Sequence, residues 1–153
     1  MKKFTPRKLN LFLLTKLPSA YFSGVRLKSI LEDEVVVTVR HKWINQNPFK
    51  SMYWATQGMA SELTTGILVM KEIDACGKRI SMLVTQQNGI FTKKALGNIT
   101  FSCKEGNKIK SAIFETIKTG EGQTVVLTSQ GFDEQGDVVS TFEYEWSVKV
   151  KTN

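Results

Sequence analysis

Apolar residues recur along the chain at two different spacings, one typical of helices and one typical of strands. At the N-terminus, helical spacing predicts an amphipathic helix within residues 1–17, formed by Leu9, Phe12, Leu13 and Leu17. A second short amphipathic helix is predicted over residues 108–118, where Ile109, Ala112, Ile113 and Ile117 share one face. Each helix therefore has an apolar stripe that needs a cover.

The remaining apolar runs follow the period of strands. Their β-branched and aromatic residues favour six strands, at Val25–Ile30, Val35–Val39, Ile80–Gln87, Ala95–Cys103, Val125–Phe132 and Val138–Val150. Turn-forming pairs such as Asn88-Gly89 and Glu105-Gly106 separate several of them. The last strand alternates most regularly, with Phe142, Tyr144 and Trp146 on one face.

A long helix is predicted over residues 51–70, and its composition is unusual. Apolar residues recur there at helical spacing, but Glu62 and Lys71 are the only charges between residues 51 and 71. A surface helix normally has a charged outer face, so we expect this one to be covered on most sides. Ser51 is a suitable N-cap. Gly58 and Gly66 each cost helical stability, which is tolerated where another segment approaches closely.

This order of elements predicts a single α+β domain of 153 residues. One face of a six-stranded antiparallel sheet needs an apolar cover, and the charge-poor helix at 51–70 supplies it. The expected architecture is therefore a curved sheet wrapped around a long central helix. We find no internal repeat and no inter-domain linker.

The formal net charge of +7 is concentrated near the N-terminus, where Lys2, Lys3, Arg7, Lys8 and Lys16 face no acid before residue 17. This basic segment is interpreted as a solvated helix face, with attraction to an anionic ligand or a membrane surface as the alternative. Nucleic-acid binding is a third reading, but no known recognition motif accompanies the charge. No apolar run is long enough to span a membrane, so we expect a cytoplasmic protein.

Several kinds of chemistry lack the residues that they need. Cys76 and Cys103 are two isolated thiols, which indicates neither a disulfide framework nor a metal site. No phosphate-binding or dinucleotide-binding glycine motif is present. His41 is the single histidine, and no Gly-x-Ser-x-Gly turn accompanies it, so a serine triad is not expected.

The segment from Asn47 to Glu62 carries a resemblance to a known family. Asn47-Pro48-Phe49-Lys50-Ser51-Met52-Tyr53-Trp54-Ala55, followed by Gly58-Met59-Ala60-Ser61-Glu62, resembles the hotdog-fold acyl-CoA thioesterases of the phenylacetyl-CoA type. In that superfamily an asparagine-rich turn leads into His-Gly-Gly at the start of the central helix, and an acid follows about two turns later. Here Tyr53, Trp54 and Ala55 replace His-Gly-Gly, whereas Asn47 and Glu62 are retained.

The resemblance implies hydrolysis of an acyl thioester, with coenzyme A as part of the substrate and no separate cofactor. Glu62 is then the base or nucleophile, the backbone N–H of Trp54 contributes to the oxyanion hole, and Asn47 orients water or the carbonyl group. Substrate contacts are expected from Tyr53, Ser51, Lys93 and Lys94, the two lysines facing the phosphates.

Simpler roles exist for the same residues. Glu62 is also compatible with a buried ion pair, Asn47 with a turn, Tyr53 and Trp54 with core or interface aromatics, and Lys93 and Lys94 with an ordinary surface. The loss of His-Gly-Gly leaves a second hypothesis open, a non-catalytic acyl-CoA-binding hotdog protein. The resemblance also implies a homodimer or a tetramer, because hotdog sites usually form between two protomers, and an open sheet edge such as Ile80–Gln87 needs a partner.

Overall fold

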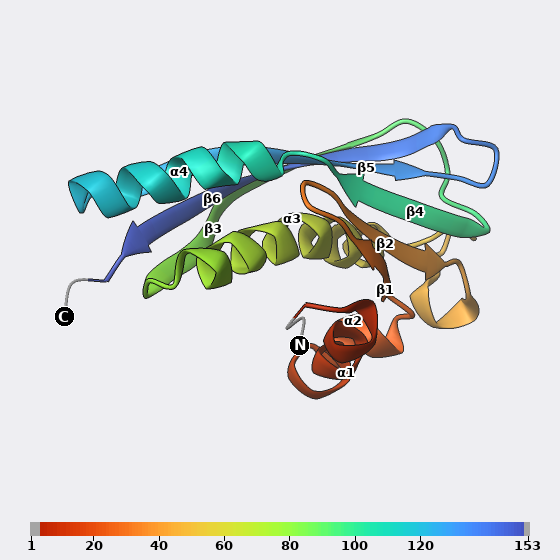
Figure 1. The fold of residues 1–153 in the computed structure, drawn as a ribbon. Helices are drawn as coiled ribbons and strands as arrows, with labels where there is room; N and C mark the ends of the chain where they lie inside the picture. Colours follow the sequence, from red (N-terminus) through yellow and green to blue (C-terminus); the bar gives the residue numbers. More distant parts are fainter. Residues whose placement is uncertain (1–3, 152–153) are drawn as a thin grey trace.

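A computed structural model describes residues 4–151 of the chain, and Figure 1 shows their arrangement. The elements follow one another as α1 (Pro6–Lys16), α2 (Pro18–Phe22), β1 (Arg26–Ile30), β2 (Val35–Arg40), a 3-10 helix η1 (Trp43–Asn45), α3 (Trp54–Cys76), β3 (Ile80–Phe91), β4 (Asn98–Cys103), α4 (Gly106–Thr119), β5 (Gln123–Phe132) and β6 (Val138–Val150). All six predicted strands and all three predicted helices are present. The short helices α2 and η1 were not predicted.

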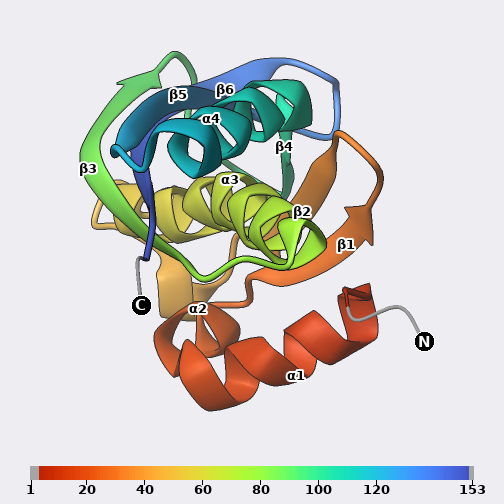
Figure 2. The same ribbon diagram turned by 60° about the vertical axis from the view of Figure 1, so that its left-hand side comes forward.

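The six strands form one antiparallel sheet in the order β1-β2-β4-β5-β6-β3. Figure 2 shows this sheet curling around α3, with α4 packed against α3, β5 and β6 and with α1 below. The apolar core lies between α3 and the concave face of the sheet, as buried Phe101, Phe142 and Leu68 illustrate. The predicted hotdog fold, a curved sheet around a long central helix, is confirmed.

The neutral polar residues of α3 are bonded to the sheet. Four pairs join the helix to β5 and β6: Ser140 Oγ donates to Gln57 Oε1 (2.7 Å), Ser61 Oγ lies 2.7 Å from Tyr144 Oη, Thr64 Oγ1 donates to Ser129 Oγ (2.9 Å), and Trp146 Nε1 donates to Thr65 Oγ1 (3.0 Å). We call these four pairs the polar seam. Because the seam satisfies buried polar groups, this helix is covered without needing charged residues.

The start of α3 differs from the prediction. The helix begins at Trp54 with Tyr53 as N-cap, and no side chain caps it, so Ser51 is not the N-cap. Ser51 instead belongs to the loop before the helix, where its hydroxyl is hydrogen-bonded to the side chain of Asn47. At the other end α3 continues to Cys76, six residues beyond the predicted end, and stops at Gly77, whose φ of 65° is left-handed.

Of the two helix glycines, one lies against a large side chain. A Cβ on Gly66 would come within 3.3 Å of the Trp146 indole and 3.2 Å of Glu62 Oε1, so this glycine allows the helix to approach β6. Gly58 has no such neighbour within 4 Å, so close approach within this chain does not explain it.

The two edges of the sheet are finished differently. At β1 the side chain of Asn10 imitates a neighbouring strand, because it donates to Leu27 O (3.1 Å) and accepts from Leu27 N (2.9 Å). At the opposite edge β3 pairs with β6 alone, and it exposes Leu83 and Ile90. The structure therefore covers one edge within the chain and leaves the other open.

The N-terminal segment forms two helices because Pro18 starts a new one after α1 ends at Lys16. Leu9 and Leu13 of α1 are buried, as the amphipathic pattern predicted. Lys2 and Lys3 of the predicted helix lie outside the described residues. Between residues 4 and 151 no helix is both long and apolar enough to cross a membrane.

Removing one acceptor from the polar seam should destabilise the fold measurably. Thr65→Val keeps the shape of the side chain but leaves the buried indole N–H of Trp146 without its partner, which costs about 1–3 kcal/mol of unfolding free energy. The control is Thr15→Val, because the Thr15 hydroxyl is exposed on α1 and its loss should change stability by less than about 0.5 kcal/mol. Urea denaturation measures both, and equal losses would mean that the seam is not stabilising.

Candidate functional site

A cleft of about 480 Å³ opens at the N-terminal end of α3. Its walls come from the loop before α3 and from the segment that follows β3, and Met52 N joins them by donating to Ala95 O (2.9 Å). Six of the seven residues predicted for the site line it, namely Asn47, Ser51, Tyr53, Trp54, Lys93 and Lys94. The predicted clustering of these six residues is therefore found within one chain.

Asn47 shapes the wall of the cleft. Its Oδ1 accepts from Phe49 N (2.9 Å) and Ser51 N (3.2 Å), and its Nδ2 donates to Ser51 Oγ (3.1 Å). These bonds close the turn that carries the chain into α3. The amide of Asn47 therefore holds the loop, and its contact with a ligand would have to compete with these bonds.

Free backbone donors point outward where α3 begins. Among residues 4–151, no acceptor pairs with the N–H of Trp54 or Ala55, whereas the amides of Thr56 and Gln57 both donate to Tyr53 O. The positive end of the helix dipole lies at the same place. The start of α3 therefore offers two donors and a favourable potential to a negatively charged oxygen atom.

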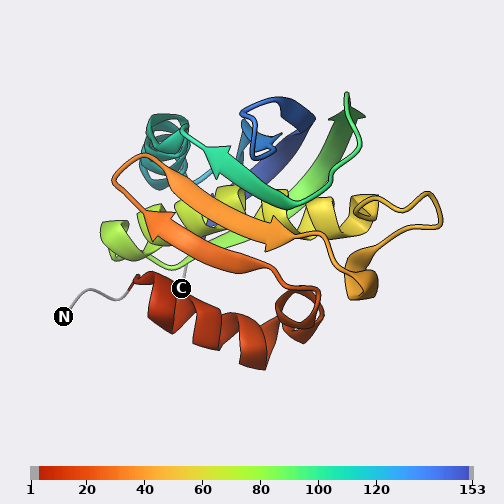
Figure 3. The ribbon, with the colours of Figure 1, turned by 90° about the vertical axis from the view of Figure 1, so that its right-hand side faces the viewer.

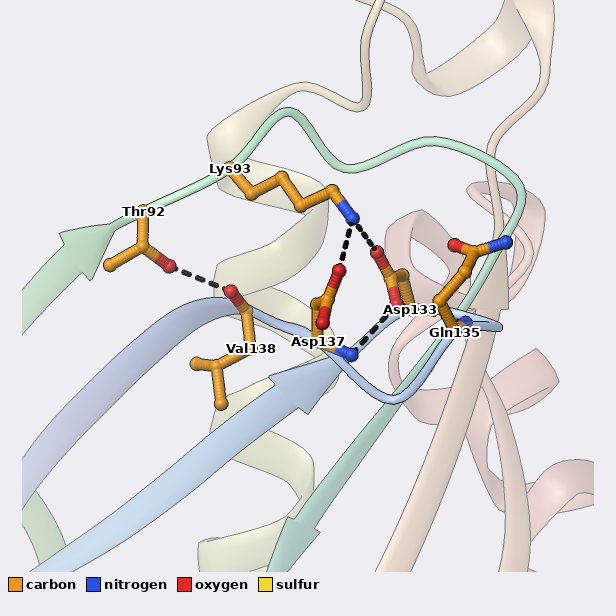
Figure 4. Close-up of polar contacts among 6 residues, drawn as sticks. All are labelled: Thr92, Lys93, Asp133, Gln135, Asp137 and Val138. Carbon is orange, nitrogen blue, oxygen red and sulfur yellow. Dashed lines mark hydrogen bonds and ion pairs between the residues drawn. The ribbon is translucent and has the colours of Figure 1, made fainter.

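The two candidate lysines are in different electrostatic situations. Lys93 Nζ contacts Asp133 Oδ2 at 2.6 Å and Asp137 Oδ2 at 2.7 Å, which Figure 4 shows as a bridge to the turn between β5 and β6. Hydrogen bonding to Asp133, and then to Asp137, raises the pKa of Lys93. Two carboxylates thus already neutralise this ammonium group. Lys94 is exposed and makes no ion pair with a described residue.

Glu62 lies away from the cleft, which corrects the expectation of one shared crevice within the chain. It follows Trp54 by eight residues, or about 12 Å along the helix axis. Its side chain lines a separate apolar cavity of about 70 Å³ between α1, α3, β3 and β6, with Leu13, Met82 and Trp146 among its walls. The helix is too rigid to bring both groups to one point, so a single chain holds two separated parts of the predicted site.

The carboxylate of Glu62 has no partner among the described residues. Neither an ion pair nor a side-chain hydrogen bond from residues 4–151 reaches it, so it is not half of a buried ion pair with any of these residues. Desolvation by burial raises the pKa of Glu62 above the usual 4.5. Burial likewise raises the pKa of Tyr144 to about 12, and the charge of Glu62 adds to this effect. An unpaired buried carboxylate is costly to the fold, and costly groups are concentrated at functional sites.

Between Trp54 and Val69, one strip of α3 remains partly exposed while the other residues are buried. It consists of Trp54, Ala55, Gly58, Met59 and Glu62, and we call it the open strip. The polar seam follows a neighbouring line of the same helix, about a quarter turn away, so the strip lies beside the contact with the sheet and not within it. It runs from the cleft to Glu62 and connects the two candidate parts.

The sequence interpretation missed two residues of the cleft. Gln57 lines it although the residue is almost fully buried, and its Oε1 is held by Ser140. Phe91 lines it from the end of β3, four residues beyond the predicted strand. Only the absence of charge in α3 hinted at Gln57, and no local pattern marked Phe91.

Three solved structures illustrate the similarity of the fold. A Pseudomonas aeruginosa protein of unknown function named "Probable Thioesterase" matches with a TM-score of 0.81 and 23% identity over 96% of this chain and 97% of that one. A Haemophilus influenzae thioesterase matches with a TM-score of 0.71 and 15% identity, over 97% of this chain and 93% of that one. A Staphylococcus aureus thioesterase, in a glutamine-to-alanine variant, matches with a TM-score of 0.65 and 14% identity, over 91% of this chain and 98% of that one. A glutamate-to-alanine variant of the same protein also matches.

At these identities the similarity establishes the fold alone. No curated protein matches the sequence. A family profile matches residues 8–148, which is nearly the whole domain. The chain therefore belongs to the DUF4442 family, a domain of unknown function.

Proposed function

We propose that the protein is an acyl-CoA thioesterase that works as a homodimer, each active site combining the cleft of one subunit with Glu62 of the partner subunit. The observation that carries this proposal is Glu62 itself, a half-buried carboxylate at the end of the open strip that has no partner among residues 4–151. Hydrolysis of a thioester needs a base for water, and a carboxylate with a raised pKa is suited to that role.

The comparison with the Staphylococcus aureus thioesterase supports the choice of residues. The glutamine and the glutamate that were replaced in its two variants lie 15 positions apart. Asn47 and Glu62 have the same separation in this chain. Equal spacing in the same fold favours an equivalent pair of positions.

The geometry assigns a part of the reaction to each group. The thioester carbonyl lies against the N–H groups of Trp54 and Ala55, which stabilise the negative charge that develops on its oxygen. Glu62 of the partner subunit removes a proton from water as the water oxygen attacks the carbonyl carbon. The carbon–sulfur bond then breaks, and the thiol leaves with a proton returned from Glu62. Lys94, at the rim of the cleft, attracts the phosphates of coenzyme A.

A dimer explains why the two parts are separated in one chain. The edge of β3 is not paired with a further strand of the chain, and Trp54, at the start of the open strip, is exposed. Pairing of β3 with its symmetry mate would cover this edge and bring two copies of α3 together. A twofold axis then places the open strip of each subunit opposite the other.

Glu62→Gln should abolish hydrolysis while binding is retained. The amide has nearly the same size as the carboxylate but cannot accept the proton from water, so kcat should fall about 10²–10⁴-fold against a panel of acyl-CoA thioesters. Isothermal titration with the same thioesters should still detect binding. Tight binding by a wild-type protein that hydrolyses none of them would favour the non-catalytic acyl-binding function instead.

Removing one backbone donor tests the cleft separately. Trp54→Pro deletes an N–H at the first position of the helix, where proline is tolerated, and Tyr53 before it already has an extended backbone with ψ of 137°. The control is Trp54→Ala, which removes the same indole but keeps the amide. We expect kcat of the proline variant to lie about 10²–10³-fold below that of the alanine variant.

Mixed dimers decide whether the site is shared between subunits. A dimer of one Glu62→Gln subunit and one Trp54→Pro subunit contains one intact site if the site spans two subunits. Activity should therefore return when the two inactive variants are co-expressed and purified through separate tags. A purified mixed dimer that regains no activity would contradict a site shared between subunits.

The pH dependence of stability provides an independent test of the Glu62 environment. Because its pKa is raised, the folded protein holds this proton more tightly than the unfolded chain does, so stability falls as pH rises from about 4.5 through the raised value. Glu62→Gln should thus raise the melting temperature at pH 8 and have much less effect at pH 4. Glu143→Gln, on the exposed side of β6, is the control and should leave the melting temperature unchanged.

A further inference from the structure

The excess of positive over negative charge arises in one part of the sequence. Residues 1–31 contain seven lysines and arginines and no acid, which equals the entire net charge of +7. The described part of this segment forms α1, α2 and β1, and Figure 3 shows the two helices together on one side of the molecule. This acid-free stretch plays no part in the proposed chemistry.

Large apolar side chains are exposed where α2 meets η1. Trp43 is 86% exposed, Phe22 63% and Ile44 58%. The backbone of η1, which carries Trp43 and Ile44, is anchored here, because the buried Asn45 donates to Ser23 O at 2.8 Å and to Arg40 O at 2.9 Å. The buried Asn45 thus holds η1, which carries the exposed Trp43, against the end of α2.

The outer face of α1 also exposes large apolar side chains. Leu11, on the side of the helix opposite buried Leu9 and Leu13, is 64% exposed, and Leu14 is also exposed. Arg7 and Lys16 are exposed at the two ends of this helix, and neither forms an ion pair with a residue that the structure describes. We call Leu11, Leu14, Phe22, Trp43 and Ile44, with the cations around them, the basic face.

We propose that the basic face docks the protein on an anionic lipid surface, with these apolar side chains entering the interfacial layer. Tryptophan favours the boundary between lipid and water. Exposed cations of this region, such as Lys16 at the end of α1 and Lys42 next to Trp43 in the chain, are attracted to negative headgroups. A helix with exposed leucines and flanking cations fits the plane of that boundary. This inference does not depend on the proposed hydrolysis.

Other occupants fit the basic face less well. A second copy of the chain would place two faces of the same positive sign against each other, which opposes a twofold contact there. Nucleic acid would pair with the cations but would not favour exposed leucine and isoleucine side chains. The combination of one charge sign with aliphatic and aromatic side chains therefore favours a lipid surface.

Vesicle sedimentation tests the proposal on the full-length protein. We expect binding to vesicles of phosphatidylcholine mixed with phosphatidylglycerol, and at least about tenfold weaker binding to phosphatidylcholine alone. The double change Phe22→Ser and Trp43→Ser should lower the partition coefficient at least about tenfold, because two large apolar side chains no longer enter the lipid. Each of Arg7→Gln and Lys42→Gln should lower it about fivefold.

Matched variants on the opposite side of the molecule provide the controls. Phe114, on α4, is 63% exposed, and Phe114→Ser should leave vesicle binding unchanged, as should Lys149→Gln on β6. In addition, Trp43→Phe should keep the binding but lose the blue shift of tryptophan emission that vesicles cause. Equal loss of binding in Phe114→Ser and the double variant would overturn the proposal. So would absence of vesicle binding together with salt-sensitive binding to single-stranded RNA.

Discussion

The polar seam between α3 and the strands β5 and β6 is the interaction on which the rest of this structure depends. Four hydrogen-bonded pairs set both the position of the helix along its axis and its rotation about that axis, relative to the sheet. Apolar contacts alone are non-directional and would tolerate a small rotation. Because buried polar groups must be paired, the seam allows one orientation. That orientation decides that Trp54 and Glu62 stay outside the contact between the helix and the sheet.

The fixed orientation of α3 also explains why the candidate site is divided. A straight helix keeps its free N-terminal amides and Glu62 about two turns apart, and no bend in the chain can close that distance. The cleft and the small cavity therefore remain separate within one subunit. The same rigidity makes the helix a suitable scaffold for a shared site, because a twofold axis can bring two precisely held halves together.

The uncovered surfaces of the domain differ in chemistry, and this difference suggests a division of work. The β3 edge and the open strip combine unpaired strand atoms with one carboxylate, which suits contact with a second subunit. The basic face has exposed aromatic and aliphatic side chains among cations, which suits a lipid surface. Asn10 links the two arrangements, because it ties α1 to β1 and thereby leaves β3 as the available edge.

The sequence by itself determined the elements and the fold, since the periods of apolar residues and the lack of charge in residues 51–70 depend on local properties. It also brought Asn47, Tyr53 and Trp54 to one cleft, because they are close in the chain. Only the tertiary structure decided that Glu62 lines a separate cavity and that Ser51 belongs to the loop before α3. It also decided that Lys93 forms ion pairs with Asp133 and Asp137. Those outcomes depend on contacts between residues far apart in sequence, which no local pattern records.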